Sequence, residues 1–297
     1  MRKLIVLIVA LLALGMAAGA ELNVVATDFP CYDLARQVAG ENGSVTLLIH
    51  PGVEVHSYEP SPADILAISG ADLFVYIGGE SDAWADSILA GFDGEGPKAL
   101  RMMDAVSLLE EEGEDGHVHD EPEYDEHIWT SPVNAVKMVE AIRDELSGID
   151  PAHAGAYAAN ADSYIGQIEA IDADFRAIVD ASETRELVFA DRFPFLYFVR
   201  EYGLDYVAAF PSCTADTEPT PQTILTLIRA VAENHLPAVF TIEMSTQAVA
   251  RTVAEETGAE ILTLHSLQTV TQDEFDAGET WVSLMQKNVE ALREGLK

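Results

Sequence analysis

The sequence predicts an α/β protein with two lobes, each built on a mainly parallel sheet flanked by helices, and with one long helix joining them. Short apolar runs alternate with stretches of helical spacing in both halves of the chain, which predicts right-handed crossovers between parallel strands. Between the halves, residues 149–182 carry a helical pattern that is long for a crossover within one sheet. A chain of 297 residues that is 48% apolar can fill two cores.

The N-terminus predicts export. Arg2 and Lys3 precede an apolar run at 4–16, and the small residues 18–20 offer a cleavage site before Glu21. The run is short for a transmembrane helix. We expect residues 1–20 to be a signal peptide, with the mature protein in the periplasm or at the outer face of the cytoplasmic membrane; an uncleaved anchor is the alternative.

The N-terminal lobe is expected over residues 21–148. Its predicted strands lie at 22–27, 45–49 and 72–77, and helices are expected from about Cys31, Ser61 and Pro132. Each apolar run is short enough for a buried strand and is followed by residues with helical spacing.

An acidic stretch at about 109–126 interrupts this lobe. No core can be built from it, so we expect a mobile loop. Two interpretations of its histidines, His117 and His119, stay open: they belong to a solvated charge run, or they capture a divalent cation weakly and pass it to a nearby site.

The C-terminal lobe is expected over residues 183–297. Its predicted strands lie at 187–189, 206–210, 238–242 and 261–264. Each is followed by polar candidates for a site, namely Asp191 with Arg192, Cys213, Glu243 and His265.

The charge excludes some partners. The chain has 51 acidic and 16 basic residues, a formal net charge of −35. Such a surface repels phosphate backbones and attracts cations, so we expect no nucleic-acid partner. Adaptation to a salty medium would give the same composition, because salt screens the repulsion between the carboxylates.

Two histidines indicate a metal site. His56 follows the predicted strand 45–49, and His127 precedes a helix that starts at Pro132. Ligands of open α/β sheets bind outside the carboxyl ends of the strands. Each histidine alone is compatible with a solvated loop, but two in different strand-helix units indicate ligands for one metal ion.

Four segments carry a resemblance to a known family: Pro51-Gly52 with His56-Ser57-Tyr58-Glu59, residues 125–132, Tyr202-Gly203-Leu204 and residues 254–258. They resemble the metal-binding component of ABC importers of the ZnuA/TroA type, over essentially the whole mature chain. The resemblance implies a cleft between the lobes that holds a transition-metal ion with residues from both. It also implies an ABC permease as partner, and we expect a monomer.

The chain departs from the family pattern at one predicted ligand. Arg192 stands where the family has its third histidine, and arginine has no lone pair to donate. His265 matches the position after the last strand where the family has a carboxylate ligand. The resemblance therefore implies a site of His56, His127 and His265, with Glu243 as tentative fourth ligand.

Other roles around this site stay open. Asp191 or a water could replace Glu243 as the fourth ligand. Arg192 would pair with Glu243 or Asp191 and orient it; its alternative is a structural ion pair away from the metal. For His265 the alternative is a satisfied histidine at a strand end.

Histidine-rich ligation favours Zn²⁺ over Mn²⁺, which prefers carboxylate oxygens, while Ni²⁺ and Cu²⁺ can compete by affinity. We expect binding to weaken as the pH falls through the histidine range, because a protonated imidazole cannot coordinate.

The two cysteines, Cys31 and Cys213, fall one in each lobe. In an exported protein they predict a disulfide, which here would staple the lobes across the cleft. A pair of free thiols or a thiolate ligand to the metal are the alternatives.

We therefore expect an extracytoplasmic solute-binding protein that delivers zinc to a permease and has no enzymatic activity. One alternative is a secreted zinc hydrolase with Glu243 as general base, but no His-Glu-x-x-His motif is present. The other alternative is a surface adhesin or metal buffer on the same fold, since fold does not fix function.

Overall fold

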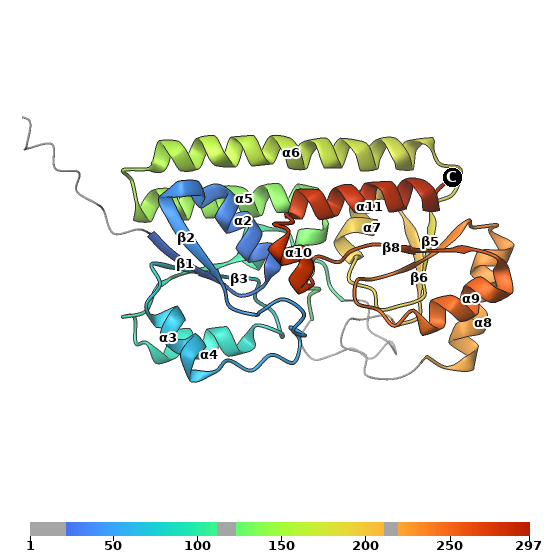
Figure 1. Cartoon of the computed structure of the whole chain (residues 1–297), viewed down its shortest axis with the longest axis horizontal. Helices are drawn as coiled ribbons and strands as arrows, with labels where there is room; N and C mark the ends of the chain where they lie inside the picture. Colours follow the sequence, from blue (N-terminus) through green and yellow to red (C-terminus); the bar gives the residue numbers. More distant parts are fainter. Residues whose placement is uncertain (1–21, 112–122, 211–218) are drawn as a thin grey trace, which may run out of the picture.

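The computed structural model describes residues 22–111, 123–210 and 219–297. They form two α/β lobes that lie side by side beneath the long helix α6 (Ala154–Ala181), as Figure 1 shows. The predicted fold class is confirmed. The predicted signal peptide, His117, His119 and Cys213 lie outside the described residues.

The N-terminal lobe is a four-stranded parallel sheet with the strand order β2-β1-β3-β4. Its elements are β1 (Leu22–Ala26), α2 (Phe29–Ala39), the 3₁₀ turn η1 (Gly40–Asn42), β2 (Gly43–Leu47), α3 (Pro62–Ser69), β3 (Leu73–Tyr76), α4 (Ala83–Gly91), β4 (Lys98–Arg101) and the 3₁₀ turns η2 (Met102–Ala105) and η3 (Ile128–Thr130). The sequence did not predict β4 or α4.

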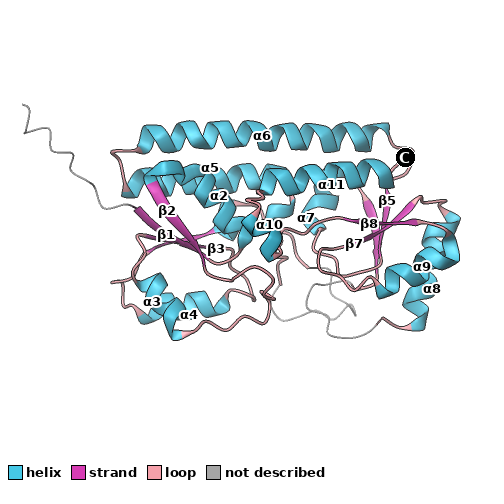
Figure 2. Ribbon diagram, viewed as in Figure 1, coloured by secondary structure: helices cyan, strands magenta, loops and turns pink. Residues whose placement is uncertain are grey.

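The C-terminal lobe repeats this plan with the strand order β6-β5-β7-β8, again all parallel. Its elements are β5 (Glu186–Phe189), α7 (Leu196–Tyr202), β6 (Asp205–Ala208), α8 (Pro221–Glu233), β7 (Ala238–Thr241), α9 (Ala248–Thr257), β8 (Glu260–Thr263), α10 (Gln272–Asp276) and α11 (Trp281–Gly295). Figure 2 shows the two sheets as separate sets of strands.

Side-chain caps fix where several helices begin, and so fix the loops before them. Ser61 Oγ accepts a hydrogen bond from Asp64 N, and the Asp64 carboxylate accepts one from Ser61 N, so α3 begins with a full capping box. At the start of α5 (Pro132–Ile149), Ser131 Oγ accepts a hydrogen bond from Asn134 N, and Pro132 occupies the first position of the helix. The loops that carry His56 and His127 end at these two caps.

Helix α6 has 28 residues, which at 1.5 Å per residue is about 42 Å. It packs against α5 on the N-terminal side and against α11 on the C-terminal side, so it bridges both lobes (Figure 1). The domain boundaries predicted near residues 148 and 182 stay a prediction.

One apolar core runs through both lobes on the helix side. It contains Val24 of β1, Ile168 of α6, Phe189 of β5 and the two fully buried tryptophans Trp129 and Trp281. The Trp281 indole donates to the Trp129 carbonyl at 3.0 Å. Separate smaller cores cover the opposite face of each sheet.

A buried carboxylate reinforces this side. Asp33 of α2 is 0% exposed and accepts hydrogen bonds from Tyr164 Oη of α6 at 2.6 Å and from Trp281 N of α11 at 2.7 Å. The Arg36 guanidinium lies 2.8 Å from the same carboxylate and neutralises its charge. Three helices from both halves of the chain are thereby joined at one point.

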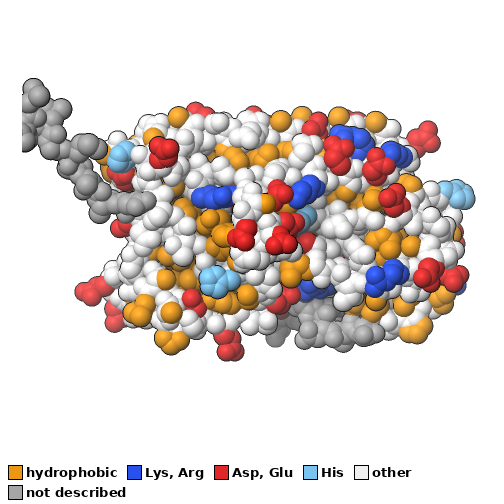
Figure 3. Space-filling view, in the orientation of Figure 1, with side chains coloured by type: hydrophobic (Ala, Val, Ile, Leu, Met, Phe, Trp, Pro, Cys, Tyr) orange, Lys and Arg blue, Asp and Glu red, His pale blue; other side chains and the backbone are white. Residues whose placement is uncertain are grey.

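The surface carries the acidic excess. Figure 3 shows acidic side chains spread over one face, between basic and apolar ones. No helix among the described residues combines the length and the apolar character that a membrane crossing requires.

Candidate metal site

His56 and His127 lie beside each other at the carboxyl edge of the N-terminal sheet. His56 comes from the loop between β2 and α3, and His127 from the segment before η3. Their ring centroids are 5.7 Å apart. Two loops far apart in the sequence thus bring these histidines together, and their binding of one metal ion stays a prediction.

His127 is held in the tautomer that a metal needs. Its Nδ1 lies 3.3 Å from Asp125 Oδ1, and the His127 backbone N donates to the same oxygen at 2.8 Å. An ionised carboxylate only accepts, so Nδ1 carries the proton and Nε2 carries the lone pair. The ring is 3% exposed, and its orientation is fixed by Asp125.

His56 is placed in the same way. Its Nδ1 lies 2.6 Å from Ser81 Oγ, and its Nε2 lies 2.8 Å from the amide nitrogen of Gln268. An amide nitrogen only donates, so Nε2 is the acceptor and Nδ1–H donates to Ser81. Burial, and then the electrostatic interaction with His127, lowers the pKa of His56 to about 4, so the ring is neutral at neutral pH.

Glu126 and Gly79 position the serine that holds His56. Glu126 Oε1 accepts a hydrogen bond from Ser81 N at 2.8 Å. Gly79 has φ 85°, and a side chain there would overlap the Glu126 carboxylate, so the turn needs glycine on both counts.

The C-terminal lobe meets this site with polar contacts. Gln268 bonds to His56, and Thr269 Oγ1 accepts from Gly52 N at 3.1 Å. Arg192 Nη1 lies 3.1 Å from Glu54 Oε2, two residues before His56. The arginine predicted to pair with Glu243 or Asp191 thus reaches across to the other lobe.

Asp191 offers one oxygen to the interior. Its Oδ1 accepts from Arg192 N at 2.9 Å. Its Oδ2 is buried and makes no hydrogen bond to any residue in the described part of the chain. A buried carboxylate oxygen of this kind is costly unless a cation or donor reaches it.

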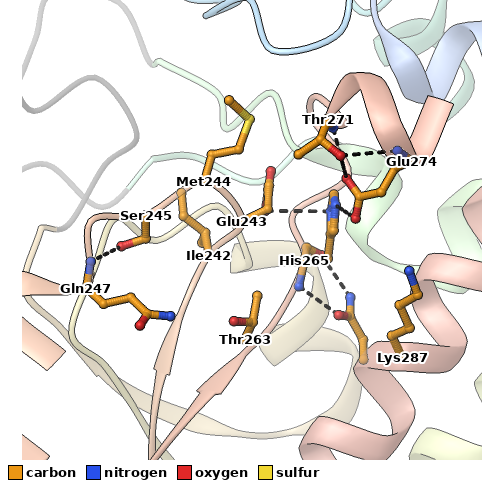
Figure 4. Close-up of a pocket in the computed structure, with 11 residues that line it drawn as sticks. Ile242, Glu243, Met244, Ser245, Gln247, Thr263, His265, Thr271, Glu274 and Lys287 are labelled. Atoms are coloured by element: carbon orange, nitrogen blue, oxygen red, sulfur yellow. Dashed lines mark hydrogen bonds and ion pairs between the residues drawn. The ribbon is translucent and has the colours of Figure 1, made fainter. Parts of the chain in front are cut away.

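His265 and Glu243 lie together in a different place, a pocket of the C-terminal lobe (Figure 4). His265 Nδ1 is 3.6 Å from Glu243 Oε2, and His265 Nε2 is 3.7 Å from Glu274 Oε1. Leu267 N donates to Nδ1 at 2.9 Å, so the lone pair sits on Nδ1 and the proton on Nε2. In this state Nε2 is a donor and not a metal ligand.

The predicted ligands therefore form two pairs, His56 with His127 and His265 with Glu243. Within residues 22–111, 123–210 and 219–297, no three His, Cys, Asp or Glu side chains are arranged to hold a metal ion. Coordination by His265 or Glu243 together with the two histidines would require the segment that carries them to move, whereas Gln268 of the same lobe already contacts His56.

Cys31 lies in the first turn of α2, where the Asp28 cap begins the helix. It is a free thiol and is 0% exposed. Burial, and then the charge of Asp28, raises its pKa well above the ordinary value, which disfavours a thiolate ligand. Its predicted disulfide partner, Cys213, is outside the described residues.

Four side chains around these sites were not predicted from the sequence: Asp125, Ser81, Gln268 and Glu274. Asp125 could have been found, because a carboxylate two residues before a predicted ligand is a common orienting partner. Gln268 gave no signal, since 212 residues separate it from His56.

Comparisons with known proteins agree on one family. The model of the family described as "Zinc-uptake complex component A periplasmic" matches residues 24–295. The zinc-binding lipoprotein AdcA of Streptococcus pneumoniae is 34% identical over 310 residues, covering 99% of this chain and 61% of AdcA. This chain thus spans about three fifths of that relative's length.

Two further comparisons cover nearly whole chains. The high-affinity zinc uptake system protein ZnuA of Bacillus subtilis is 32% identical, covering 94% of this chain and 88% of its own length. The crystal structure of the Zn(II)-bound ZnuA-like domain of Streptococcus pneumoniae AdcA has a TM-score of 0.79 at 32% identity, covering 93% of this chain and 99% of that domain.

Proposed function

This chain belongs to the family of periplasmic component A proteins of zinc-uptake complexes, and on that premise we propose that it captures Zn²⁺ outside the cytoplasm and delivers it to an ABC-type permease. The names of its relatives describe zinc binding and zinc uptake rather than catalysis. The proposal includes export, to the periplasm or the outer face of the cytoplasmic membrane, and a monomeric carrier.

The observation that carries the proposal is the pairing of His56 and His127. Both rings are held through Nδ1 by a neighbouring side chain, with the acceptor lone pair on Nε2. Zinc binds imidazole nitrogens at about 2.0–2.1 Å, and orienting partners on the other ring nitrogen are the rule at such sites. The N-terminal lobe therefore supplies half of a tetrahedral shell.

The C-terminal lobe must supply or admit the remaining ligands. The metal would displace the Gln268 amide nitrogen from His56, after which the amide oxygen of the same side chain could coordinate. Asp191 Oδ2 is a second candidate. His265 and Glu243 can join only if Leu267 N releases His265 Nδ1 and the ring leaves its pocket.

Two imidazoles favour zinc over Mn²⁺, while Ni²⁺ and Cu²⁺ compete for the same nitrogens. The test is elemental analysis of residues 21–297 after dialysis against all four metals together. We expect one zinc per chain. Retention of manganese in preference to zinc would contradict the assignment.

Two variants localise the metal. His127→Ala removes a ligand, so retained zinc should vanish. The control is His50→Ala, because His50 is an exposed histidine in the same segment between β2 and α3 as His56. This variant should keep its zinc. Absence of zinc from the unmodified protein would overturn the proposed function, and equal retention in both variants would overturn the site.

A further inference from the structure

We propose that the pocket around His265 is a second binding site and that it takes a small zwitterion of the α-amino acid class. The pocket has a volume of about 310 Å³ and lies at the carboxyl ends of β7 and β8. This is the edge at which α/β sheets bind ligands, and the volume is at the lower end of the range for small-molecule sites. Its walls come from the loop after β7, from α10 and from α11 (Figure 4).

The first argument is an unused donor. The His265 side chain is 7% exposed, and its Nε2 makes no hydrogen bond to any described residue. Because Leu267 N donates to Nδ1, the proton of the neutral ring must sit on Nε2. A buried donor without an acceptor costs free energy, and a ligand oxygen in the pocket would remove that cost.

The second argument is the charge beside this donor. Glu274 Oε2 accepts from Thr271 N and Thr271 Oγ1, both at 2.9 Å, and its other oxygen, Oε1, faces His265. The two hydrogen bonds from Thr271 hold this carboxylate in place beside the ring. Glu243 lies on the other side of the ring. Together the two carboxylates suit an ammonium group.

The third argument is the positively charged side chain in the wall of the same pocket. Lys287 of α11 lines it, and its ammonium group is 2.7 Å from Glu279 Oε1. An ammonium group has three donors, so one bond to Glu279 leaves others for a ligand carboxylate. The donors of His265 and Lys287 and the acceptors of Glu243 and Glu274 match the two charges of a zwitterion.

The chemistry of the pocket disfavours a transition metal. Coordination by His265 Nε2 would force the proton onto Nδ1, against the Leu267 N–H. Among the described residues, no three metal-binding side chains are grouped in this pocket so that they could hold a metal ion.

Two residues that line the pocket have a strained backbone conformation. Met244 and Gln247 both line the pocket with φ 56°, a left-handed conformation that is uncommon for residues other than glycine. Such strain concentrates at ligand sites. Met244 is also 57% exposed, which offers an apolar surface for an uncharged ligand side chain.

The test uses the metal-free mature chain and isothermal titration calorimetry. The probes are L-leucine, L-methionine and L-glutamine, with butylamine and butyrate as analogues that keep one charge each. We expect at least one amino acid to bind with a dissociation constant below about 1 mM, and both analogues to bind at least about tenfold more weakly. No binding up to about 10 mM, or equal binding of butylamine, would overturn the proposal.

Two variants place the ligand. Glu274→Gln keeps the cap of α10, because glutamine serves in a capping box, but removes the charge. Lys287→Gln removes the cation. Each should weaken amino-acid binding by about tenfold. The matched control is Lys98→Gln, an exposed lysine of the other lobe, which should bind as the unmodified protein does. Unchanged binding in both pocket variants would reject the site.

Zinc binding separates this proposal from the proposed function. Glu274→Gln should still hold zinc, since the side chains that place the His56 and His127 rings are Ser81, Asp125 and Gln268. His127→Ala should still bind the amino acid. Loss of both ligands in either variant would contradict two independent sites.

Discussion

His127 and His265 occupy matching places in the two lobes and differ in one hydrogen bond. Both lie just beyond the carboxyl edge of a parallel sheet, and both are buried, at 3% and 6% exposed. Nδ1 of His127 faces the Asp125 carboxylate, whereas Nδ1 of His265 faces the Leu267 N–H. The first contact leaves Nε2 as an acceptor and the second leaves it as a donor.

The difference shows that a histidine at a sheet edge becomes a ligand only through its neighbour. The N-terminal lobe holds two rings whose Nε2 atoms carry a lone pair for a metal. The C-terminal half presents an amide, a guanidinium and a protonated Nε2. We therefore expect the two halves to respond very differently to substitution.

The largest effect should separate the two histidines directly. His127→Ala should weaken zinc binding by about a thousandfold, because one of two preformed ligands is lost, while His265→Ala should change it by less than about threefold. Competition with a fluorescent zinc chelator measures both. An equal loss of zinc affinity in His265→Ala would show that His265 moves out of its pocket and coordinates the ion. The two histidines would then not differ in function.

Asp125→Asn should come next. An amide can present either a donor or an acceptor to His127 Nδ1, so the tautomer is no longer fixed. We expect zinc affinity to fall by about 10–100-fold, the range for a lost orienting partner. The same chelator competition applies, with Asp150→Asn, which faces the exposed His153, as matched control. Affinity that is indifferent to Asp125 would remove the argument from the tautomer.

Gln268→Glu tests what the C-terminal half lacks. A carboxylate 2.8 Å from His56 Nε2 would replace a donor with an anionic ligand. We expect zinc to bind about tenfold more tightly, because the ion then has a charged oxygen beside two imidazoles. Weaker binding in this variant would mean that Gln268 serves the metal better as an amide than as a carboxylate.

The smallest effect concerns protons. Burial lowers the pKa of His56 to about 4, below the ordinary value of 6.5. The unfolded chain then takes up the proton first, so the contribution of His56 to stability falls as the pH drops from 6.5 toward 4. Protons should also compete with zinc for His56 only near that lower pH, whereas at an ordinary histidine they would compete from about pH 6.5 downward.

An NMR titration of the His56 ring in the metal-free protein measures this midpoint. His50, which is exposed, provides the internal reference in the same spectra. A His56 midpoint near the ordinary histidine value would show that the ring is solvated in solution and that the Gln268 contact does not persist.

The fold followed from the sequence wherever strands were apolar runs. β1, β3 and β7 are such runs, and the pattern of α6 had no internal break. Strand β4 was not predicted, because Lys98–Arg101 is an edge strand that pairs only with β3 and has a charged residue at each end. An edge strand of this kind has no periodic signature to detect.

The site was predictable only in its N-terminal half. His56 and His127 follow from their loops. The proton position on His265 is set by the backbone N–H of Leu267, and a backbone donor has no residue identity to read from a sequence. The Arg192–Glu54 contact joins positions 138 residues apart in different lobes, so its partner could not be assigned from local pattern.

The apolar core that runs through both lobes, between the sheets and the long helices, makes the two lobes one cooperative unit. Trp129 and Trp281 lie in that core and link the two halves of the chain. Melting of either lobe exposes apolar surface that the other lobe also buries, so calorimetry should show a single transition. The free energy of binding an ion at His56 and His127 then stabilises both lobes against unfolding. Amide hydrogen exchange should therefore slow as far away as β6.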